Sequence, residues 1–230
     1  MLFKSLMLSQ ASGSIAGATF SRNAGGMYVR SRALPTNPNT ENQQIVRSAM
    51  ANLVVQWRDS LSEALRQQWN TYAFNTPTLN KLGESTHKTG QQMFLRGNIA
   101  RIQAGLPLAI NGPSLFDVGD FTDPSPIIAD SSASTISIAF TAVDGWATEE
   151  DSALLIYQSR PQNPTRNFGK GPYQLASMVL GVDPGPAVSP HVFASLFPMN
   201  VGQRFFFKFN VTRADGRFSG SRTASTIVVA

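Results

Sequence analysis

The sequence predicts an α+β protein in which an N-terminal β-ribbon arm and a small helical unit precede an all-β sandwich of the immunoglobulin or fibronectin type III kind. Three observations lead to this class. Apolar and basic residues alternate near the N-terminus, an apolar period of 3.6 residues follows, and beyond Pro113 the period is two. The expected boundaries are 1–38 for the arm, 39–110 for the helical domain and 111–230 for the sandwich.

The composition agrees with a packed chain that hides much of its surface. Of its 230 residues 42% are hydrophobic, enough for a sizeable core, whereas only 14% are charged. Soluble domains average about 25% charged residues, so burial in an assembly is expected. The chain has no cysteine, which excludes disulfides, thiolate metal sites and thiol nucleophiles.

Positive charge is concentrated in the first half of the chain. Residues 1–110 carry 11 Lys and Arg against 4 Asp and Glu, and residues 111–230 carry 8 against 10, which agrees with the formal net charge of +5. These arginines could meet phosphate or an acidic protein surface, and composition alone leaves that choice open. They are Arg22, Arg30, Arg32, Arg47, Arg58, Arg66, Arg96 and Arg101.

Residues 15–20 and 27–34 are expected to form two strands of the arm, separated by the turn-rich segment 21–26. On the second strand the period of two places Tyr28, Arg30 and Arg32 on one face and Met27, Val29 and Ala33 on the other. Pro35 and Pro38 then end the ladder, because proline has no N–H to donate.

A two-stranded ribbon is marginally stable alone, and its open edges invite partner strands. We therefore expect the arm to become ordered against other chains, and we predict an interface there. The predicted interface residues are Phe20, Arg22, Asn23, Met27, Tyr28, Val29, Arg30 and Arg32.

Three helices are expected after the arm. The first starts at Asn39 or Thr40, either of which can cap it, and its apolar side chains recur every four residues. These are Ile45, Ala49, Leu53, Trp57 and Leu61, with Val46, Met50 and Val54 beside them. The second helix, capped by Ser60 or Ser62, should form an antiparallel hairpin with the first. The third is expected over residues 90–103, before Gly105 and Pro107.

Beyond Pro113 six or seven short strands are expected in about 110 residues, the pattern of a β-sandwich. The clearest runs are 135–140, 153–158, 173–180, 191–196, 204–212 and 223–229. Run 204–212 and the following Asp215-Gly216 turn resemble the final hairpin of fibronectin type III domains. This likeness concerns the fold and implies no function.

The residues needed for catalysis are sparse, so we expect no enzyme, no catalytic residue and no cofactor site. The histidines are His87 and His191, in separate predicted domains, and no Gly-x-Ser-x-Gly, Walker or His-Glu-x-x-His motif occurs. Gly169-Lys170-Gly171 is interpreted as a turn rather than an anion cradle. Residues 149–151 (Glu-Glu-Asp) lack EF-hand spacing, so a solvated loop is favoured over a calcium site, and no metal site is predicted.

Neither a cleaved signal peptide nor a membrane partner is expected. The first ten residues lack a continuous apolar run of the length that a signal peptide needs. No window approaches the roughly 18 apolar residues of a membrane span.

Several segments in the first 105 residues resemble a poorly characterised family of proteins encoded by tailed bacteriophages and prophages. They are Gly13-Ser-Ile-Ala-Gly17, Phe20-Ser-Arg-Asn23, Gly26-Met-Tyr-Val-Arg30, Pro35-Thr-Asn-Pro-Asn-Thr40, Gln44-Ile-Val-Arg47 and Trp69-Asn-Thr-Tyr-Ala73. The resemblance implies a virion component with a mechanical role, made in the host bacterial cytoplasm. It does not give the position in the particle.

The resulting hypothesis is a structural protein that docks onto a capsid, connector or tail lattice, with head decoration preferred and with homo-oligomers formed in the particle. Three alternatives stay open. A surface or secreted adhesion module would bind glycan with its sandwich. A nucleic-acid-packaging protein would use Tyr28 and the neighbouring arginines. A tail enzyme would cleave glycan or peptide at a site that the sequence does not reveal.

Overall fold

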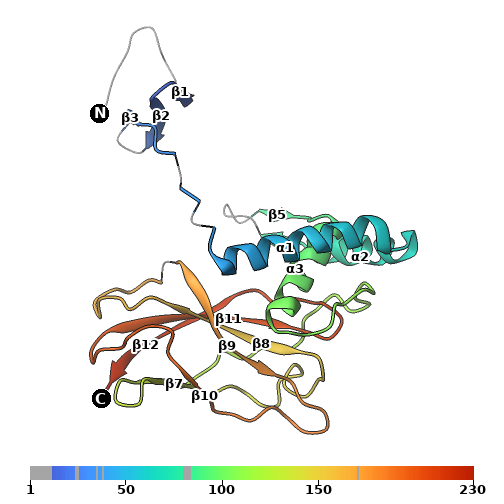
Figure 1. Cartoon of the computed structure of the whole chain (residues 1–230). Helices are drawn as coiled ribbons and strands as arrows, with labels where there is room; N and C mark the ends of the chain where they lie inside the picture. The colour runs from blue at the N-terminus through green and yellow to red at the C-terminus, as the bar shows by residue number, and fades with distance from the viewer. Residues whose placement is uncertain (1–11, 24–25, 35, 38, 80–83, 170) are drawn as a thin grey trace. The chain divides into compact units, whose positions relative to one another are not determined.

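The computed structural model describes residues 12–23, 26–34, 36–37, 39–79, 84–169 and 171–230 (Figure 1). The chain divides into two compact units, Met1–Gln44 and Ile45–Ala230. The predicted α+β class is confirmed, because a small helical part accompanies a large β-sandwich. The predicted boundaries near residues 38 and 110 stay predictions.

The N-terminal unit contains a three-stranded antiparallel sheet, not the predicted two-stranded ribbon. Its strands are β1 (Gly13–Ile15), β2 (Ala18–Asn23) and β3 (Gly26–Ser31), in the order β1-β2-β3. The expected first strand is broken by a two-residue turn, in which Ala16 has a φ of 49°. The predicted turn over 21–26 is mostly strand as well, because residues 21–23 pair with 26–28. Residues 24 and 25 lie outside the described part.

The helices are α1 (Glu41–Val55), α2 (Glu63–Asn75) and α3 (Gly90–Gln103). A π-helical turn, Gln56–Ser60, follows α1. Ser62, one of the two predicted caps, accepts the N–H of Leu65 (3.4 Å), and α3 starts with a capping box between Thr89 and Gln92. A short hairpin of β4 (Thr78–Leu79) and β5 (Ser85–Thr86) lies between α2 and α3.

The prediction that the first two helices pack together as an antiparallel hairpin is wrong, because α2 packs mainly on α3. Trp69 and Phe94 meet edge to face with ring centroids 5.5 Å apart, and Trp57 lies 5.5 Å from the same Phe94 ring. Leu53 near the end of α1 is also buried in this cluster. The π-helical turn and the extended Leu61 carry the chain away from α1 before α2 begins. Most of the α1 stripe therefore stays uncovered.

The sandwich has seven strands in the hydrogen-bonded order β10-β7-β6-β12-β11-β8-β9. They are β6 (Ile127–Asp130), β7 (Thr135–Ile138), β8 (Ala153–Ser159), β9 (Tyr173–Leu180), β10 (His191–Ala194), β11 (Arg204–Thr212) and β12 (Arg222–Val229). Residues 222–227 of β12 pair with β11, and Val228 and Val229 pair in parallel with β6, so β12 joins the two sheets. The two sheets are therefore β10-β7-β6 and β12-β11-β8-β9.

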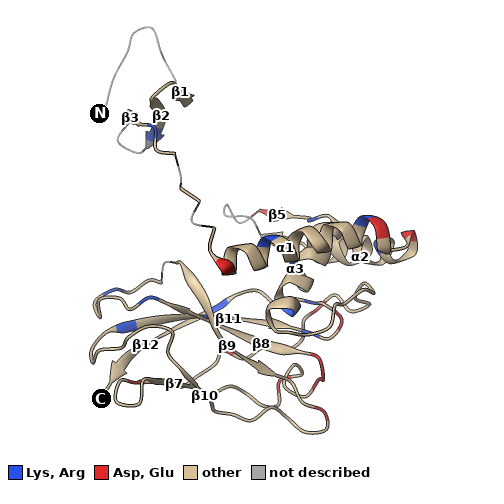
Figure 2. Cartoon of the chain, in the orientation of Figure 1, with Lys and Arg blue, Asp and Glu red and all other residues tan. Residues whose placement is uncertain are grey.

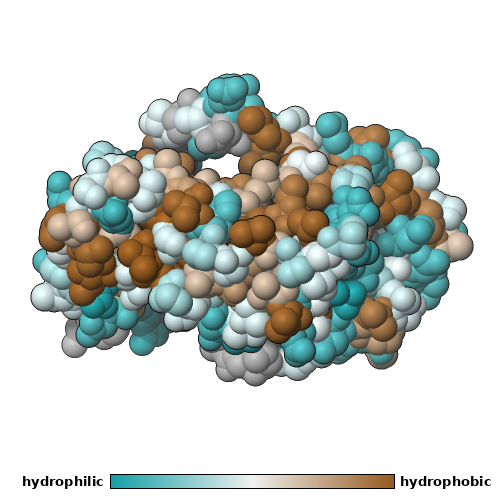
Figure 3. Space-filling model, turned by 90° about the horizontal axis from the view of Figure 1, so that it is seen from below, coloured by the Kyte–Doolittle hydropathy of each residue, from teal (hydrophilic) through white to brown (hydrophobic). Residues whose placement is uncertain are grey.

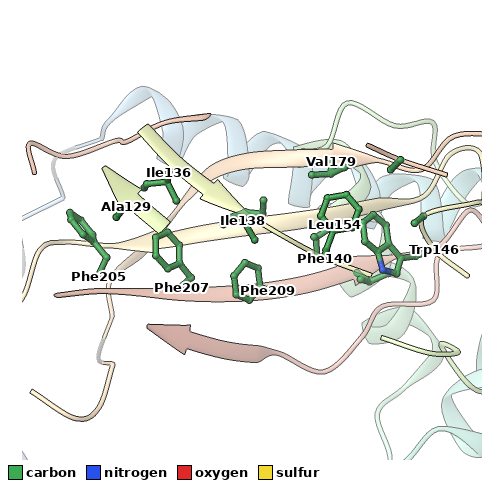
Figure 4. Packing of buried hydrophobic residues seen from close by; sticks show 14 of the residues in the cluster. Ala129, Ile136, Ile138, Phe140, Trp146, Leu154, Val179, Phe205, Phe207 and Phe209 are labelled. Carbon is green, nitrogen blue, oxygen red and sulfur yellow. The ribbon is translucent and has the colours of Figure 1, made fainter. Parts of the chain in front are cut away.

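The sandwich core lies between the two sheets. Phe205, Phe207 and Phe209 alternate along β11 and point towards Ile136 and Ile138 of the opposite sheet (Figure 4). All five side chains are fully buried. Burial of one such ring contributes about 1.5–3 kcal/mol, so this strand is a main source of stability.

A tight contact between two glycines joins α3 to the sandwich. A Cβ on Gly97 of α3 would lie 2.2 Å from the carbonyl oxygen of Gly216, in the turn between β11 and β12. A Cβ on Gly216 would lie 2.9 Å from the ring of Trp69 and 2.8 Å from the Cβ of Ala109. The Asp215-Gly216 turn of the predicted hairpin therefore also fills the helical core.

Arg101 strengthens the same junction from within. Its guanidinium donates to the carbonyls of Pro107 (2.6 Å), Asp151 (2.8 Å) and Arg213 (2.6 Å), and the side chain is buried. The three carbonyls belong to separate loops, so one side chain fixes α3 against two turns of the sandwich. Burial of the side chain lowers the pKa of Arg101 from its ordinary value.

Candidate interaction surface

The register of the arm sheet decides which predicted interface residues share a face. Phe20 lies opposite Val29 and Arg22 opposite Met27, so these four residues lie on one face. Thr19 opposite Arg30 and Ser21 opposite Tyr28 make up the other face. The structure therefore places Arg22 with the apolar group, so the predicted basic and apolar faces are less separate than the sequence indicated.

The last two predicted interface residues lie at the ends of strands. Asn23 ends β2 opposite Gly26. Arg32 follows β3, and its backbone N–H donates to the carbonyl of Gly17 (2.8 Å). The side chain of Arg32 is exposed, as are those of Arg22 and Arg30.

Each outer strand of the arm sheet has one strand partner among the described residues. Within the described residues, β1 and β3 each pair only with β2. An open edge presents unpaired N–H and C=O groups, which a further strand can satisfy. The arm sheet thus offers two positions for strand addition.

The arm is also purely cationic. Residues 1–40 contain four Lys and Arg and no Asp or Glu, and Figure 2 shows blue but no red on β2 and β3. A basic surface of this kind attracts acidic groups over about one Debye length, roughly 8 Å at physiological ionic strength. An acidic partner surface fits this charge.

A second candidate surface is the apolar face of α1. Four side chains of the predicted core stripe, Ile45, Val46, Met50 and Val54, are exposed, with Ile45 at 53% and Met50 at 44%. A groove of about 540 Å³ lies between α1 and the segment after α3. It is lined by Ile45, Ser48, Ala49, Asn52, Leu53, Gln56, Ile102, Gly105, Leu106, Pro107 and Leu108. Apolar faces of this kind typically mark contacts between proteins.

The helical pattern predicted this apolar stripe but not its exposure. Periodicity shows which face of a helix is apolar, and it does not show what covers that face. On the sandwich, by contrast, exposed apolar residues form several separate groups between polar ones (Figure 3).

Several arginines that were candidates for binding acids are instead used inside the molecule. Arg96 lies over the ring of Phe218 (5.1 Å to the centroid) and donates to the carbonyl of Ser219, and Arg101 is the buried residue at the α3 junction. Burial also lowers the pKa of Arg96. Arg66 donates to the carbonyls of Trp57 and Arg58. The exposed arginines of the arm are therefore better candidates for an interface.

The two histidines lie in different surroundings. The ring of His87 stacks on that of Phe74, with centroids 5.4 Å apart. His191 Nε2 lies 2.8 Å from the hydroxyl of Ser177, and burial lowers the pKa of His191. This distance suits a base and a nucleophile, but no carboxylate is hydrogen-bonded to His191 in the described part of the chain. The sequence did not indicate this pair, because its members lie on different strands.

The acidic loop is held by basic side chains. The Glu149 carboxylate forms an ion pair with Arg213, and the Asp151 carbonyl accepts from Arg101. Among the described residues no group of three or more His, Cys, Asp or Glu could hold a metal ion.

Comparison with known protein families, curated proteins and solved structures finds no match for this chain. None of the helices formed by the described residues is both long enough and apolar enough to cross a bilayer.

Proposed function

We propose that the chain is a non-enzymatic structural component of a tailed-bacteriophage virion, which docks by its arm and helices onto a capsid, connector or tail lattice. The observation that carries the proposal is the cationic arm sheet, whose two edges have no strand partner among the described residues. Such a sheet is suited to pairing with neighbouring chains. The resemblance of the first 105 residues to phage proteins supports the same role.

Docking combines three contributions. A strand of a neighbouring subunit adds to β1 or β3 and satisfies the open edge. The apolar groups of the arm and of α1, among them Met27, Val29 and Met50, are buried in the contact. Arg22, Arg30 and Arg32 pair with carboxylates of the neighbour. Repetition of these contacts in a symmetric lattice adds avidity without any new contact.

The proposal favours head decoration over a tail or connector position, because an arm of this kind suits clamping over a lattice. Mass spectrometry of purified particles, with the copy number measured against the major capsid protein, tests it. A copy number close to that of the capsid protein indicates decoration, and a few copies per particle indicate a connector or tail. Absence of the protein from the particles would overturn the proposal.

Deletion of residues 1–34 tests the docking mode. The truncated chain should stay soluble and folded, because the unit of residues 45–230 has its own cores. It should be missing from particles that contain the full chain. Incorporation of the truncated chain at full occupancy would contradict docking by the arm.

A further inference from the structure

One end of the outer face of the β12-β11-β8-β9 sheet is left open. At the other end α3 covers the face, where Ala100 and Ala104 pack against Ala153 and Leu155 of β8. The hydroxyl of Tyr157 donates to Gln103 of α3 (3.0 Å) and marks the limit of the covered part. No helix of the described residues covers the next row across the sheet.

This row, in which Ser159 and Phe206 are buried, forms the floor of a groove. Tyr173 of β9 lies opposite Ser159 of β8, and Phe206 of β11 lies opposite Ser225 of β12. The N–H of Phe206 donates to the hydroxyl of Ser159 (3.0 Å), so the four residues follow one another across the sheet. Across the strands the order is therefore Ser225, Phe206, Ser159 and Tyr173, so hydroxyl-bearing serines alternate with aromatic residues.

The loop between β8 and β9 provides the wall. The groove has a volume of about 410 Å³, within the range of small-ligand sites. The residues that line it are Asn167, Phe168, Gly169, Tyr173, Phe206, Thr223, Ala224 and Ser225. A Cβ on Gly169 would lie 2.4 Å from the Tyr173 hydroxyl and 2.9 Å from the Phe206 ring, so only glycine lets the loop approach the floor this closely. Phe168 is 64% exposed, although its side chain is apolar.

Two cations lie beside the groove, and within the described part of the chain neither is paired with a carboxylate. The Arg166 guanidinium lies 4.6 Å from the centroid of Phe168, and Lys208, opposite the lining residue Thr223, lies 5.4 Å from the centroid of Tyr157. Residues 152–182 and 184–214 contain no Asp or Glu. In Figure 2, β11 and the β8–β9 loop accordingly carry blue segments and no red ones. Neither Arg166 nor Lys208 forms an ion pair with a described residue.

A third cation has an unused donor. Arg204 donates through Nη1 to the carbonyl of Arg166 (3.2 Å), which places it under the same loop. Its Nε is buried and has no hydrogen-bond partner among the described residues.

We propose that this groove binds an acidic carbohydrate, a sugar chain bearing carboxylate or phosphate groups, a role beyond the structural one. The exposed Phe168 ring offers an apolar face to the C–H face of a sugar, and Asn167, Thr223 and Ser225 offer neutral donors and acceptors to its hydroxyls. Arg166 and Lys208 supply the positive charge that pairs with the acidic group.

A nucleic acid fits the groove less well than a sugar chain. Binders of single strands need cations that follow a backbone carrying one charge for each nucleotide, together with free aromatic faces. The residues that line this groove are uncharged, and the two nearby cations, Arg166 and Lys208, do not form the continuous row that such a backbone needs.

The test measures binding of the full chain to two matched pairs of ligands by calorimetry. One pair is oligogalacturonate and its methyl ester, and the other is a phosphorylated oligomannose and its dephosphorylated form. Each neutral ligand differs from its partner only in the acidic group. We expect at least one acidic ligand to bind about tenfold or more tightly than its neutral partner, the contribution of one charge-assisted hydrogen bond.

Variants then localise the site. Phe168→Ala and Lys208→Gln should each weaken that binding about tenfold or more, since each removes one of the invoked contacts. Their controls are Phe74→Ala, which removes a ring of similar exposure (72%) elsewhere, and Lys88→Gln, which removes an exposed charge elsewhere. Both controls should bind as the unchanged chain does. A third variant, Ser225→Ala, removes one hydroxyl of the groove and should weaken binding less than the other two.

Three outcomes would overturn the proposal. The first is binding of neither acidic ligand above its neutral partner. The second is binding that survives both Phe168→Ala and Lys208→Gln in folded protein. The third is tighter binding of a single-stranded oligonucleotide that both variants abolish, which would assign the groove to nucleic acid.

Discussion

The arm sheet and the junction of α3 with the sandwich use the same residue types in opposite ways. At the junction, Arg101 gives its donors to three carbonyls, and Gly97 meets Gly216 so closely that no side chain fits. In the arm, Arg22 and Arg30 are exposed, Gly13 and Gly26 have open space around them, and the strand edges have no partner within the described residues.

At the junction the polar groups have partners within the chain, whereas the arm is the part that, on the proposed function, contacts other chains. Buried donors and tightly packed glycines contribute to folding only if the chain itself supplies their partners, so substitutions there should lower stability. Exposed cations and open edges contribute little to the isolated fold. Substitutions in the arm should therefore leave stability unchanged and affect assembly. The predictions below test this contrast, in decreasing order of their effect on the free energy of unfolding.

Gly216→Ala should lower the free energy of unfolding by about 4 kcal/mol, since it adds overpacking against Trp69 to a strained backbone. Gly216 has a φ of 88°, and its Cβ would lie 2.9 Å from the Trp69 ring. Urea unfolding measures the change. Gly202→Ala is the control, because Gly202 has a similar φ of 85° but nothing within 4 Å of its Cβ. It should cost about 1–2 kcal/mol, the backbone strain alone. Equal losses in both variants would contradict the packing account.

Arg101→Met should cost about 3 kcal/mol, because three carbonyls at the junction lose their donor while the volume stays similar. Thermal and urea unfolding would measure it. Arg30→Met in the arm is the matched control and should change stability by less than about 0.5 kcal/mol. A small effect of Arg101→Met would mean that water replaces the guanidinium and that the junction is not held by it.

Replacing Arg22, Arg30 and Arg32 together by Gln should leave the free energy of unfolding within about 0.5 kcal/mol of its original value. Incorporation into particles should nevertheless fall, and the remaining incorporation should become less sensitive to salt, because fewer charges are paired in the contact. The readout is occupancy by quantitative mass spectrometry at two salt concentrations. Arg58→Gln, which removes a cation paired with the neighbouring Asp59, should leave occupancy unchanged.

The smallest effect concerns pH. Burial lowers the pKa of His191, so the folded state disfavours its protonated form. The stability that the neutral imidazole contributes is complete above the unfolded pKa of about 6.5 and is lost as pH falls below it. His191→Gln should therefore reduce the difference in urea stability between pH 7 and pH 5. In the control His87→Gln, the difference in urea stability between pH 7 and pH 5 should stay as in the original chain. If the difference also stayed unchanged in His191→Gln, the pH dependence would not come from the His191 imidazole.

Local signals predicted much of this fold. The predicted range of 90–103 for α3 matches the structure, and Gly105 and Pro107 marked its end. The sandwich was predictable from short alternating runs, and its strand β11 matches the predicted range 204–212. The strand β6 was missed, because only four residues follow the two prolines at 124 and 126.

Contacts between distant segments could not be predicted. The approach of Gly97 to Gly216 and the reach of Arg101 to Asp151 and Arg213 join segments more than 40 residues apart, and one sequence does not indicate such pairs. The groove on the sandwich is another example. Gly169-Lys170-Gly171 indicated only a turn, and the neighbouring Tyr173, Phe206 and Ser225 come from three strands.

The most direct test of the account is hydrogen exchange, measured by mass spectrometry, of the backbone amides of β1 and β3 in the isolated protein and in purified particles. If neighbouring chains satisfy the open edges, these amides should exchange fast in the isolated protein and much more slowly in the particle, while amides of β11 are slow in both. Equal exchange of the arm amides in both states would contradict docking by strand addition.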